Sequence, residues 1–265
     1  MYDSFGREIR YLRISVTDRC NLRCVYCMPA EGVASIPHEK IISYERIVAV
    51  AAAAAKLGFV KFRITGGEPL VRKNLPHLVS LLSEIPGPHS IGMTTNGTLL
   101  APVAHELKFR GLGSVNVSLD TLSPDRYAEL TRGGRLREAL EGIREARSAG
   151  LPVKLNVVMT DERSEDDLQK IRLYAEAVGA KVQTIARYRL DEKKEDGGSF
   201  DRPPPCASCD RLRLLADGTL RPCLHGSAGI PVDFADIEGS IAAAVNAKPA
   251  CGLACRETAV CGIGG

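Results

Sequence analysis

The sequence predicts an α/β fold, either a partial (β/α)6 barrel of the TIM type or an open doubly wound sheet, followed by a small C-terminal extension. Three observations support this prediction. Short β-branched or apolar runs alternate with helical patterns over residues 12–186, and several of the helical patterns end at a glycine. The third observation is length, because a complete eight-unit barrel needs more chain than this.

The expected strands are short runs rich in Val, Ile and Thr. They cover residues 12–16, 60–65, 90–95, 114–119, 153–158 and 182–186. The expected helices between them cover residues 43–57, 74–85, 100–111, 135–149 and 165–178. Glycines close four of these helices, at Gly58, Gly111, Gly150 and Gly179. Strands that alternate with helices in this way are expected to be parallel.

The pattern divides the chain into three parts. Residues 1–189 carry the strand–helix alternation, and residues 190–205 are a charged, Gly- and Pro-rich linker. Residues 206–265 form a C-terminal region that contains six of the nine cysteines.

Composition excludes several classes of protein. Of the 265 residues, 45% are hydrophobic and 25% charged, which is the usual mix of a globular protein. A formal net charge of +3 gives no general field that would attract nucleic acid or an anionic membrane. The chain has no apolar run long enough to span a bilayer, and its first residues do not resemble a signal peptide. We therefore expect a cytoplasmic protein that binds neither nucleic acid nor membrane.

Polar and cationic side chains recur at every second position of three expected strands. Alternate residues of a strand share one face, and here they are Arg13 and Ser15; Lys61, Arg63 and Thr65; and Lys154 and Asn156. One interpretation places these faces at sheet edges in contact with water. The other is a polar cavity that binds a multiply charged anion, because unpaired buried charge is otherwise costly.

The nine cysteines fall into three groups of three. They are Cys20, Cys24 and Cys27; Cys206, Cys209 and Cys223; and Cys251, Cys255 and Cys261. A chain with no export signal favours ligand sets over disulfides. The first group follows the first strand and can hold a [4Fe–4S] cluster with one iron left open. A zinc site completed by His38, or free thiols, are the alternatives.

The first cysteine group, Cys20-x3-Cys24-x2-Cys27 with Tyr26, resembles the signature of the radical S-adenosylmethionine (SAM) superfamily. Two further segments resemble the SAM-binding parts of that superfamily. They are Gly66-Gly67-Glu68-Pro69 after the second strand, and the strand ends that carry Thr94, Asn96, Ser118 and Asp120. The resemblance implies the partial (β/α)6 barrel, with SAM chelated to the open iron. It also implies a reductant protein such as flavodoxin or ferredoxin, whose electron cleaves SAM to a 5′-deoxyadenosyl radical.

Within the superfamily the chain is similar to the GTP 3′,8-cyclase family of molybdenum-cofactor biosynthesis. The similarity covers RISVTDRCNLRCVYCMP at residues 13–29, the second strand through Pro69, and the segment from Cys206 to Leu224. It implies an auxiliary [4Fe–4S] cluster on Cys206, Cys209 and Cys223 whose open iron binds guanine. It also implies GTP binding by Arg13, Lys61, Arg63, Lys154, Arg211, Arg213 and the terminal Gly264 and Gly265. The radical would take a hydrogen from the ribose, and the ribose radical would attack C8 of guanine.

The sequence departs from this family in two places. The interval from Arg187 to Pro205 is shorter than in the family. Either Arg187 or Arg189 replaces an anion-binding arginine of the missing part, or both are solvated charges of a linker. The extra Cys251, Cys255 and Cys261 resemble the SPASM or twitch domains of enzymes that modify peptides, proteins or other small molecules. They complete the second cluster, hold a third cluster, or are free thiols.

Two other functions remain alongside the cyclase: a SPASM-like radical enzyme that modifies a peptide or protein, and a non-catalytic iron–sulfur electron carrier. The cationic strand face favours the cyclase over the SPASM-like enzyme. An electron carrier would have no use for Gly66-Gly67-Glu68-Pro69.

Overall fold

The computed structural model describes residues 1–87, 89–159, 165–187, 194, 200–226 and 229–254. Its strands are β1 (Tyr11–Ser15), β2 (Lys61–Thr65), β3 (Ser90–Thr95), β4 (Ser114–Ser118), β5 (Val153–Met159), β6 (Lys181–Ala186), β7 (Arg211–Leu214), β8 (Thr219–Arg221) and β9 (Ile230–Pro231). Its α-helices are α1 (Tyr44–Lys56), α2 (Leu75–Ser83), α3 (Ala104–Phe109), α4 (Pro124–Thr131), α5 (Leu136–Ser148), α6 (Glu165–Ala177) and α7 (Ile237–Asn246). Short 3₁₀ helices cover His38–Lys40, Pro69–Val71, Ala101–Val103 and Cys206–Ser208.

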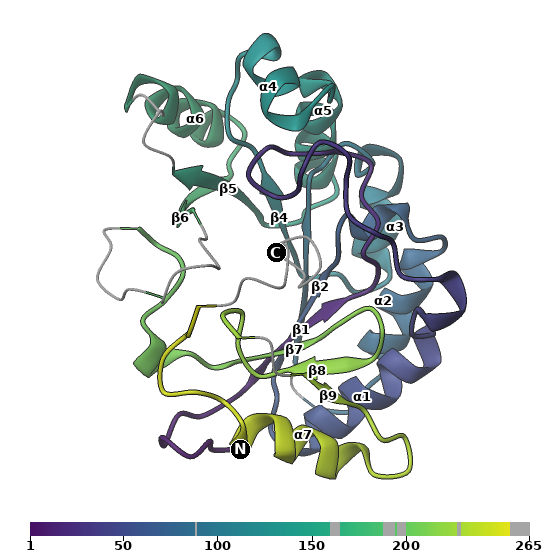
Figure 1. Ribbon diagram of the computed structural model, residues 1–265. Coiled ribbons are helices and arrows are strands. Elements are labelled where there is room, and N and C mark those ends of the chain that lie inside the picture. Colours follow the sequence, from purple (N-terminus) through teal and green to yellow (C-terminus); the bar gives the residue numbers. More distant parts are fainter. Residues whose placement is uncertain (88, 160–164, 188–193, 195–199, 227–228, 255–265) are drawn as a thin grey trace.

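The strands form one sheet in the order β6-β5-β4-β3-β2-β1-β7-β8-β9. Neighbours from β6 to β7 are parallel, whereas β7, β8 and β9 are antiparallel. The prediction of a partial (β/α)6 barrel in an α/β fold is confirmed. The region after residue 205 adds β7 directly beside β1, so it continues the same sheet (Figure 1).

Alternation along each strand separates an apolar face from a polar one. Leu12 and Ile14 of β1 and Phe62 and Ile64 of β2 are fully buried in the hydrophobic core. Helices α1, α2, α3 and α5 lie along that side of the sheet (Figure 1). The residues between them in sequence, such as Arg13, face the other way, and this face lines the cavity described below.

Local signals explain where the helices begin. The Ser43 hydroxyl caps α1 by accepting a hydrogen bond from the Arg46 amide, and five alanines, Ala51–Ala55, favour the helix that follows. The helix α4 was not among the expected helices, although Ser123 caps it and Pro124 opens it. The expected helix 100–111 is instead a 3₁₀ helix followed by α3, because Val103, with a φ of −120°, leaves the helical backbone conformation between them.

The strands β7, β8 and β9 and the helix α7 were also absent from the sequence prediction. The helix α7, capped by Asp236, packs against β8, β9 and α1. No helix among the described residues is both long and apolar enough to cross a membrane.

Candidate active site

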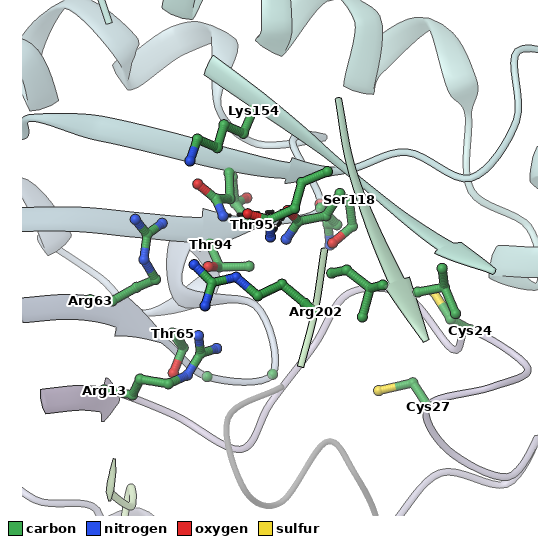
Figure 2. Close-up of a pocket in the computed structure, with 18 of the residues that line it drawn as sticks. Arg13, Cys24, Cys27, Arg63, Thr65, Thr94, Thr95, Ser118, Lys154 and Arg202 are labelled. Atoms are coloured by element: carbon green, nitrogen blue, oxygen red, sulfur yellow. Dashed lines mark hydrogen bonds between the residues drawn. The ribbon is translucent and has the colours of Figure 1, made fainter. Parts of the chain in front are cut away.

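A cavity of about 230 Å³ lies on the polar side of the sheet. It is lined by residues from all six strands β1 to β6, from the loop after β1 and from the segment near residue 202 (Figure 2). Several strands converge here because the polar alternate positions of a curved parallel sheet point to a common interior. The site therefore joins segments that lie far apart in sequence.

One wall of the cavity is strongly cationic. Arg13 of β1 is in register with Arg63 of β2, and Lys61, Lys154 and Arg211 line the same space. Among the described residues that line the cavity, seven are Arg or Lys and none is Asp or Glu. This composition suits a polyanionic ligand.

The pKa of Tyr11 reports the strength of this positive field. Burial by itself would raise the pKa, but the charges of Arg13, Arg63, Arg211 and Lys61 lower it to about 8. The Lys61 ammonium lies 4.5 Å from the centroid of the Tyr11 ring. The cations therefore act together on one point of the cavity wall.

The guanidinium of Arg63 lies across the neighbouring strand. Its Nη1 donates to the Met93 carbonyl at 3.0 Å, and it occupies the space that a side chain at position 92 would fill. A Cβ on Gly92 would lie 2.6 Å from Arg63 Nη2. The glycine therefore allows Arg63 to adopt this position.

The first cysteine group lines another part of the same cavity. Cys20, Cys24 and Cys27 are on the loop after β1, and Figure 2 shows the side chains of Cys24 and Cys27 at one side of the cavity. The end of α4 fixes this loop, since the amide of Val25 donates to the Leu130 carbonyl at 2.9 Å. The three thiols are thereby held at the carboxyl end of the sheet, where βα folds bind cofactors.

The predicted SAM-binding loop packs directly on the backbone that leads to Cys20. The amide of Gly67 donates to Thr17 O at 2.7 Å, and the amide of Glu68 donates to Arg19 O at 2.8 Å. A Cβ on Gly66 would lie 2.7 Å from the Thr17 carbonyl oxygen. Both glycines are required for this close approach of two backbones.

Two carboxylates predicted to bind SAM lie behind the cavity wall. Glu68 is buried and accepts hydrogen bonds from Thr95 Oγ1 and the Asn96 amide, both at 2.7 Å. Asp120 accepts from the Tyr26 hydroxyl at 2.5 Å and from the Val158 amide at 2.8 Å. These carboxylates hold the ends of neighbouring strands and the cysteine loop in place.

The other predicted SAM-binding residues line the cavity itself. They are Tyr26, Gly66, Gly67, Thr94, Asn96 and Ser118. Asn96 also connects the end of β3 to the cysteine loop, because its Nδ2 donates to Asn21 Oδ1 at 2.9 Å.

The buried carboxyl of Glu68 should make stability depend on pH. Burial raises its pKa from 4.5 to about 7, although three hydrogen bonds oppose the shift. The folded protein then keeps this proton more tightly than the unfolded chain, so stability present below about pH 4.5 is lost as the pH rises through 7. We expect a loss of up to about 3 kcal/mol.

Urea unfolding of the metal-free protein at pH 5 and pH 8 measures this effect. Glu68→Gln serves as the comparison, since its side chain cannot ionise. Equal pH dependence of the two proteins would contradict the prediction.

The second thiol site lies beside the start of β7. Cys206 is buried, and the Cys251 thiol lies 3.3 Å from the Cys206 sulfur, although the two are far apart in sequence. Burial raises the pKa of Cys209, but the Lys248 ammonium, 3.8 Å away, together with the Arg211 amide and the charges of Arg211 and Arg213, lowers it more, so that the net pKa is lowered. The Lys194 ammonium lies 3.4 Å from the Cys206 sulfur.

Arg7 contacts two segments that are far from it in sequence at this site, Cys206 and residues 249–250. Its guanidinium donates to the carbonyls of Cys206 at 2.9 Å, Pro249 at 2.7 Å and Ala250 at 3.2 Å. Asp3 holds the guanidinium through a buried ion pair of 2.6 Å. This contact keeps the segment before Cys251 against Cys206.

The zinc alternative for the first thiol group named His38 as the fourth ligand. Within the described part of the chain, no three His, Cys, Asp or Glu side chains are grouped to hold a single metal ion, and His38 is absent from the lining of the thiol cavity. The three thiols of the first group instead line a cavity wall, an arrangement that fits a larger iron–sulfur cluster.

Not all of the remaining sequence-predicted site residues line the cavity. Arg213 is buried on β7, is not among the residues that line the cavity, and contributes its charge to the lowered pKa of Cys209. Arg187 lines the cavity. Arg189, Cys255, Cys261, Gly264 and Gly265 lie outside the described residues.

Sequence reasoning missed several residues that line the cavity. They are Tyr11, Asn116, Gln183 and Arg202. Tyr11 was detectable, because it lies two positions before Arg13 and so shares its strand face. Arg202 was not detectable, because its position depends on pairing with Ile185 of β6.

Comparison with known proteins identifies related sequences. Residues 14–175 match the family model described as the radical SAM superfamily. A GTP 3′,8-cyclase from Pelotomaculum thermopropionicum is 44% identical over 288 aligned positions, covering 91% of this chain and 89% of the relative. One from Peptoclostridium acidaminophilum is 40% identical and covers 94% of this chain and 92% of the relative. The alignment of 288 positions exceeds this chain's 265 residues, so the Pelotomaculum protein has residues with no counterpart here.

Solved structures share the fold. SuiB of Streptococcus suis bound to S-adenosylmethionine has a TM-score of 0.68 at 15% identity, covering 89% of this chain and 66% of that chain. Native anSMEcpe with bound AdoMet has a TM-score of 0.65 at 14% identity, covering 91% of this chain and 81% of that chain.

Proposed function

This chain belongs to the GTP 3′,8-cyclase family of the radical SAM superfamily, and from that premise we propose that it cyclises GTP to the pterin precursor of the molybdenum cofactor. One observation carries the proposal. A single cavity is lined by the three thiols of the superfamily motif and by a wall of arginines and lysines, which match the triphosphate of GTP in charge.

Membership of the superfamily implies a [4Fe–4S] cluster and SAM. Cys20, Cys24 and Cys27 would hold the cluster, and the loop at Gly66 and Gly67, in contact with the backbone before Cys20, would bind SAM. When bound, the cluster and SAM would supply a 5′-deoxyadenosyl radical that takes a hydrogen atom from the ribose. The ribose carbon would then add to C8 of guanine and open the C8–N7 double bond, and the remaining unpaired electron on nitrogen would be quenched by a second electron and a proton.

The protein's own residues supply position and charge. Arg13, Arg63 and Lys154 would bind phosphate oxygens, which fixes the ribose relative to the thiol end of the cavity. Tyr26, held by Asp120, and Asn96, held by Asn21, keep the cysteine loop and the strand end at a fixed separation. No carboxylate is needed as a base in this scheme.

Turnover of reconstituted protein tests the proposal. With dithionite, SAM and GTP under anaerobic conditions, we expect the cyclised nucleotide and 5′-deoxyadenosine. Deoxyadenosine formation that GTP does not change, together with no GTP binding, would reject the cyclase function. That result would favour the alternative of a SPASM-like enzyme acting on a peptide or protein.

We further propose two [4Fe–4S] clusters, the second on Cys206, Cys209 and Cys223. Cys251 would then be a neighbour of this cluster and not a ligand, because guanine binding in the cyclase manner requires an open iron. Cys251→Ala is therefore expected to retain about eight irons per chain, as the wild type should. Iron and sulfide analysis with Mössbauer spectra measures this.

A loss of about four irons in Cys251→Ala would contradict this assignment. About twelve irons in the wild type would indicate a third cluster that includes Cys255 and Cys261. Lys248→Met is a suitable comparison, since it alters the surroundings of Cys209 without removing a thiol.

SAM cleavage takes one electron and quenching of the product radical takes a second, so we propose a flavodoxin or ferredoxin as partner. We also propose a cytoplasmic location, where thiols stay reduced.

A further inference from the structure

Residues 201 and 202 extend the sheet next to β6, although they belong to the segment that the sequence indicated as a linker. The amide of Arg202 donates to Thr184 O at 3.1 Å, and the amide of Ala186 donates to Arg202 O at 2.9 Å. The Asp201 carboxylate accepts from the Thr184 amide at 2.8 Å and from its hydroxyl at 2.9 Å. These contacts fix the backbone of Arg202 on both sides.

Register then directs the Arg202 side chain. Arg202 pairs in parallel with Ile185, and register partners in a parallel pair point to the same side of the sheet. Ile185 lines the cavity, and so does Arg202. Figure 2 shows the Arg202 side chain extending into the space that also contains Arg13 and Arg63.

Arg202 belongs electrostatically to the cationic wall. Burial lowers the pKa of Lys61, and the positive charges of Arg63 and Arg202 lower it further. The charges of Lys61, Arg63 and Arg202 are therefore close enough to act together on a polyanion that enters the cavity. A planar guanidinium can bind two phosphate oxygens at once.

We propose that Arg202 is a substrate-binding residue that contacts the triphosphate of the nucleotide. This inference rests on the proposed function. It gives the short segment before Cys206 a contact with the substrate. This segment is far from Arg13 in sequence. Arg202 is a better candidate than Arg187, which is exposed and lies after the last paired residue of β6.

Anaerobic calorimetry on the reconstituted protein tests the assignment, with GTP and guanosine as separate ligands. Arg202→Gln should weaken GTP binding about ten- to a hundredfold and leave guanosine binding unchanged. Arg202→Lys should fall between the two, because an ammonium keeps the charge but loses the second hydrogen bond. Iron content should equal that of the wild type in both.

Arg172→Gln is the matched control. It removes the same charge from an exposed position on α6, where Arg172 pairs with Glu165 at 3.4 Å, and should bind GTP as the wild type does. If the wild type binds GTP and Arg202→Gln binds it equally well, the role of Arg202 is refuted and the cyclase proposal stands. If Arg202→Gln weakens GTP and guanosine equally, the triphosphate assignment is refuted. A wild type that binds no GTP overturns both.

Discussion

Cys24→Ala is expected to reduce SAM cleavage to the background rate. Cys24 lines the cavity together with Cys20 and Cys27, and two thiolates cannot replace three in leaving a single open iron for SAM. The protein should lose about four irons per chain while its helix content stays unchanged. Deoxyadenosine measured by chromatography, iron analysis and circular dichroism together test this.

Two variants control for the substitution. Val25→Ala changes an exposed neighbour in the same loop and should retain full SAM cleavage. Cys223→Ala should also lose about four irons, but from the second site, so it should still form deoxyadenosine without substrate. Normal deoxyadenosine formation by Cys24→Ala would reject the assignment of the first cluster.

Gly67→Ala is expected to be the most damaging change that removes no ligand. An added Cβ would meet the carbonyl oxygen of Arg19 and lie 2.7 Å from its carbonyl carbon and 2.8 Å from Asp18 O. All of these are backbone atoms that cannot rotate away. The two loops must separate, which breaks the hydrogen bonds from the amides of Gly67 and Glu68.

We expect Gly67→Ala to lose about 2 kcal/mol of stability and at least tenfold in SAM affinity. Urea unfolding and anaerobic equilibrium dialysis measure the two effects. Gly87→Ala is the control. Among the described residues outside its own chain neighbours, none lies within 4 Å of the added Cβ, so only the strain of its φ of +110° remains, about 1 kcal/mol, with SAM affinity intact. Wild-type SAM affinity in Gly67→Ala would show that the loop does not position SAM.

The sequence was most informative where local periodicity determines the structure. The period of two in β1, β2 and β5 predicted the shared face of Arg13, Arg63 and Lys154, and all three line the cavity. The same rule extends to Tyr11, which the prediction overlooked. For α4, the pair Ser123-Pro124 was a usable signal that was not applied.

Long-range pairing limited what the sequence could predict. The strands β7, β8 and β9 are two to four residues long, and β7 is stabilised by β1 from the other end of the chain. The motif Gly66-Gly67-Glu68 was recognisable, but the partners of its carboxylate, Thr95 and Asn96, are known only once β2 and β3 are adjacent.

The position of Arg7 has a consequence for how the protein matures. Arg7 is translated 242 residues before Pro249 and 243 residues before Ala250, whose carbonyls it contacts. The contacts around Cys206 are therefore incomplete until Ala250 has been made. Deleting the segment that contains Arg7 is therefore expected to separate the segment before Cys251 from Cys206.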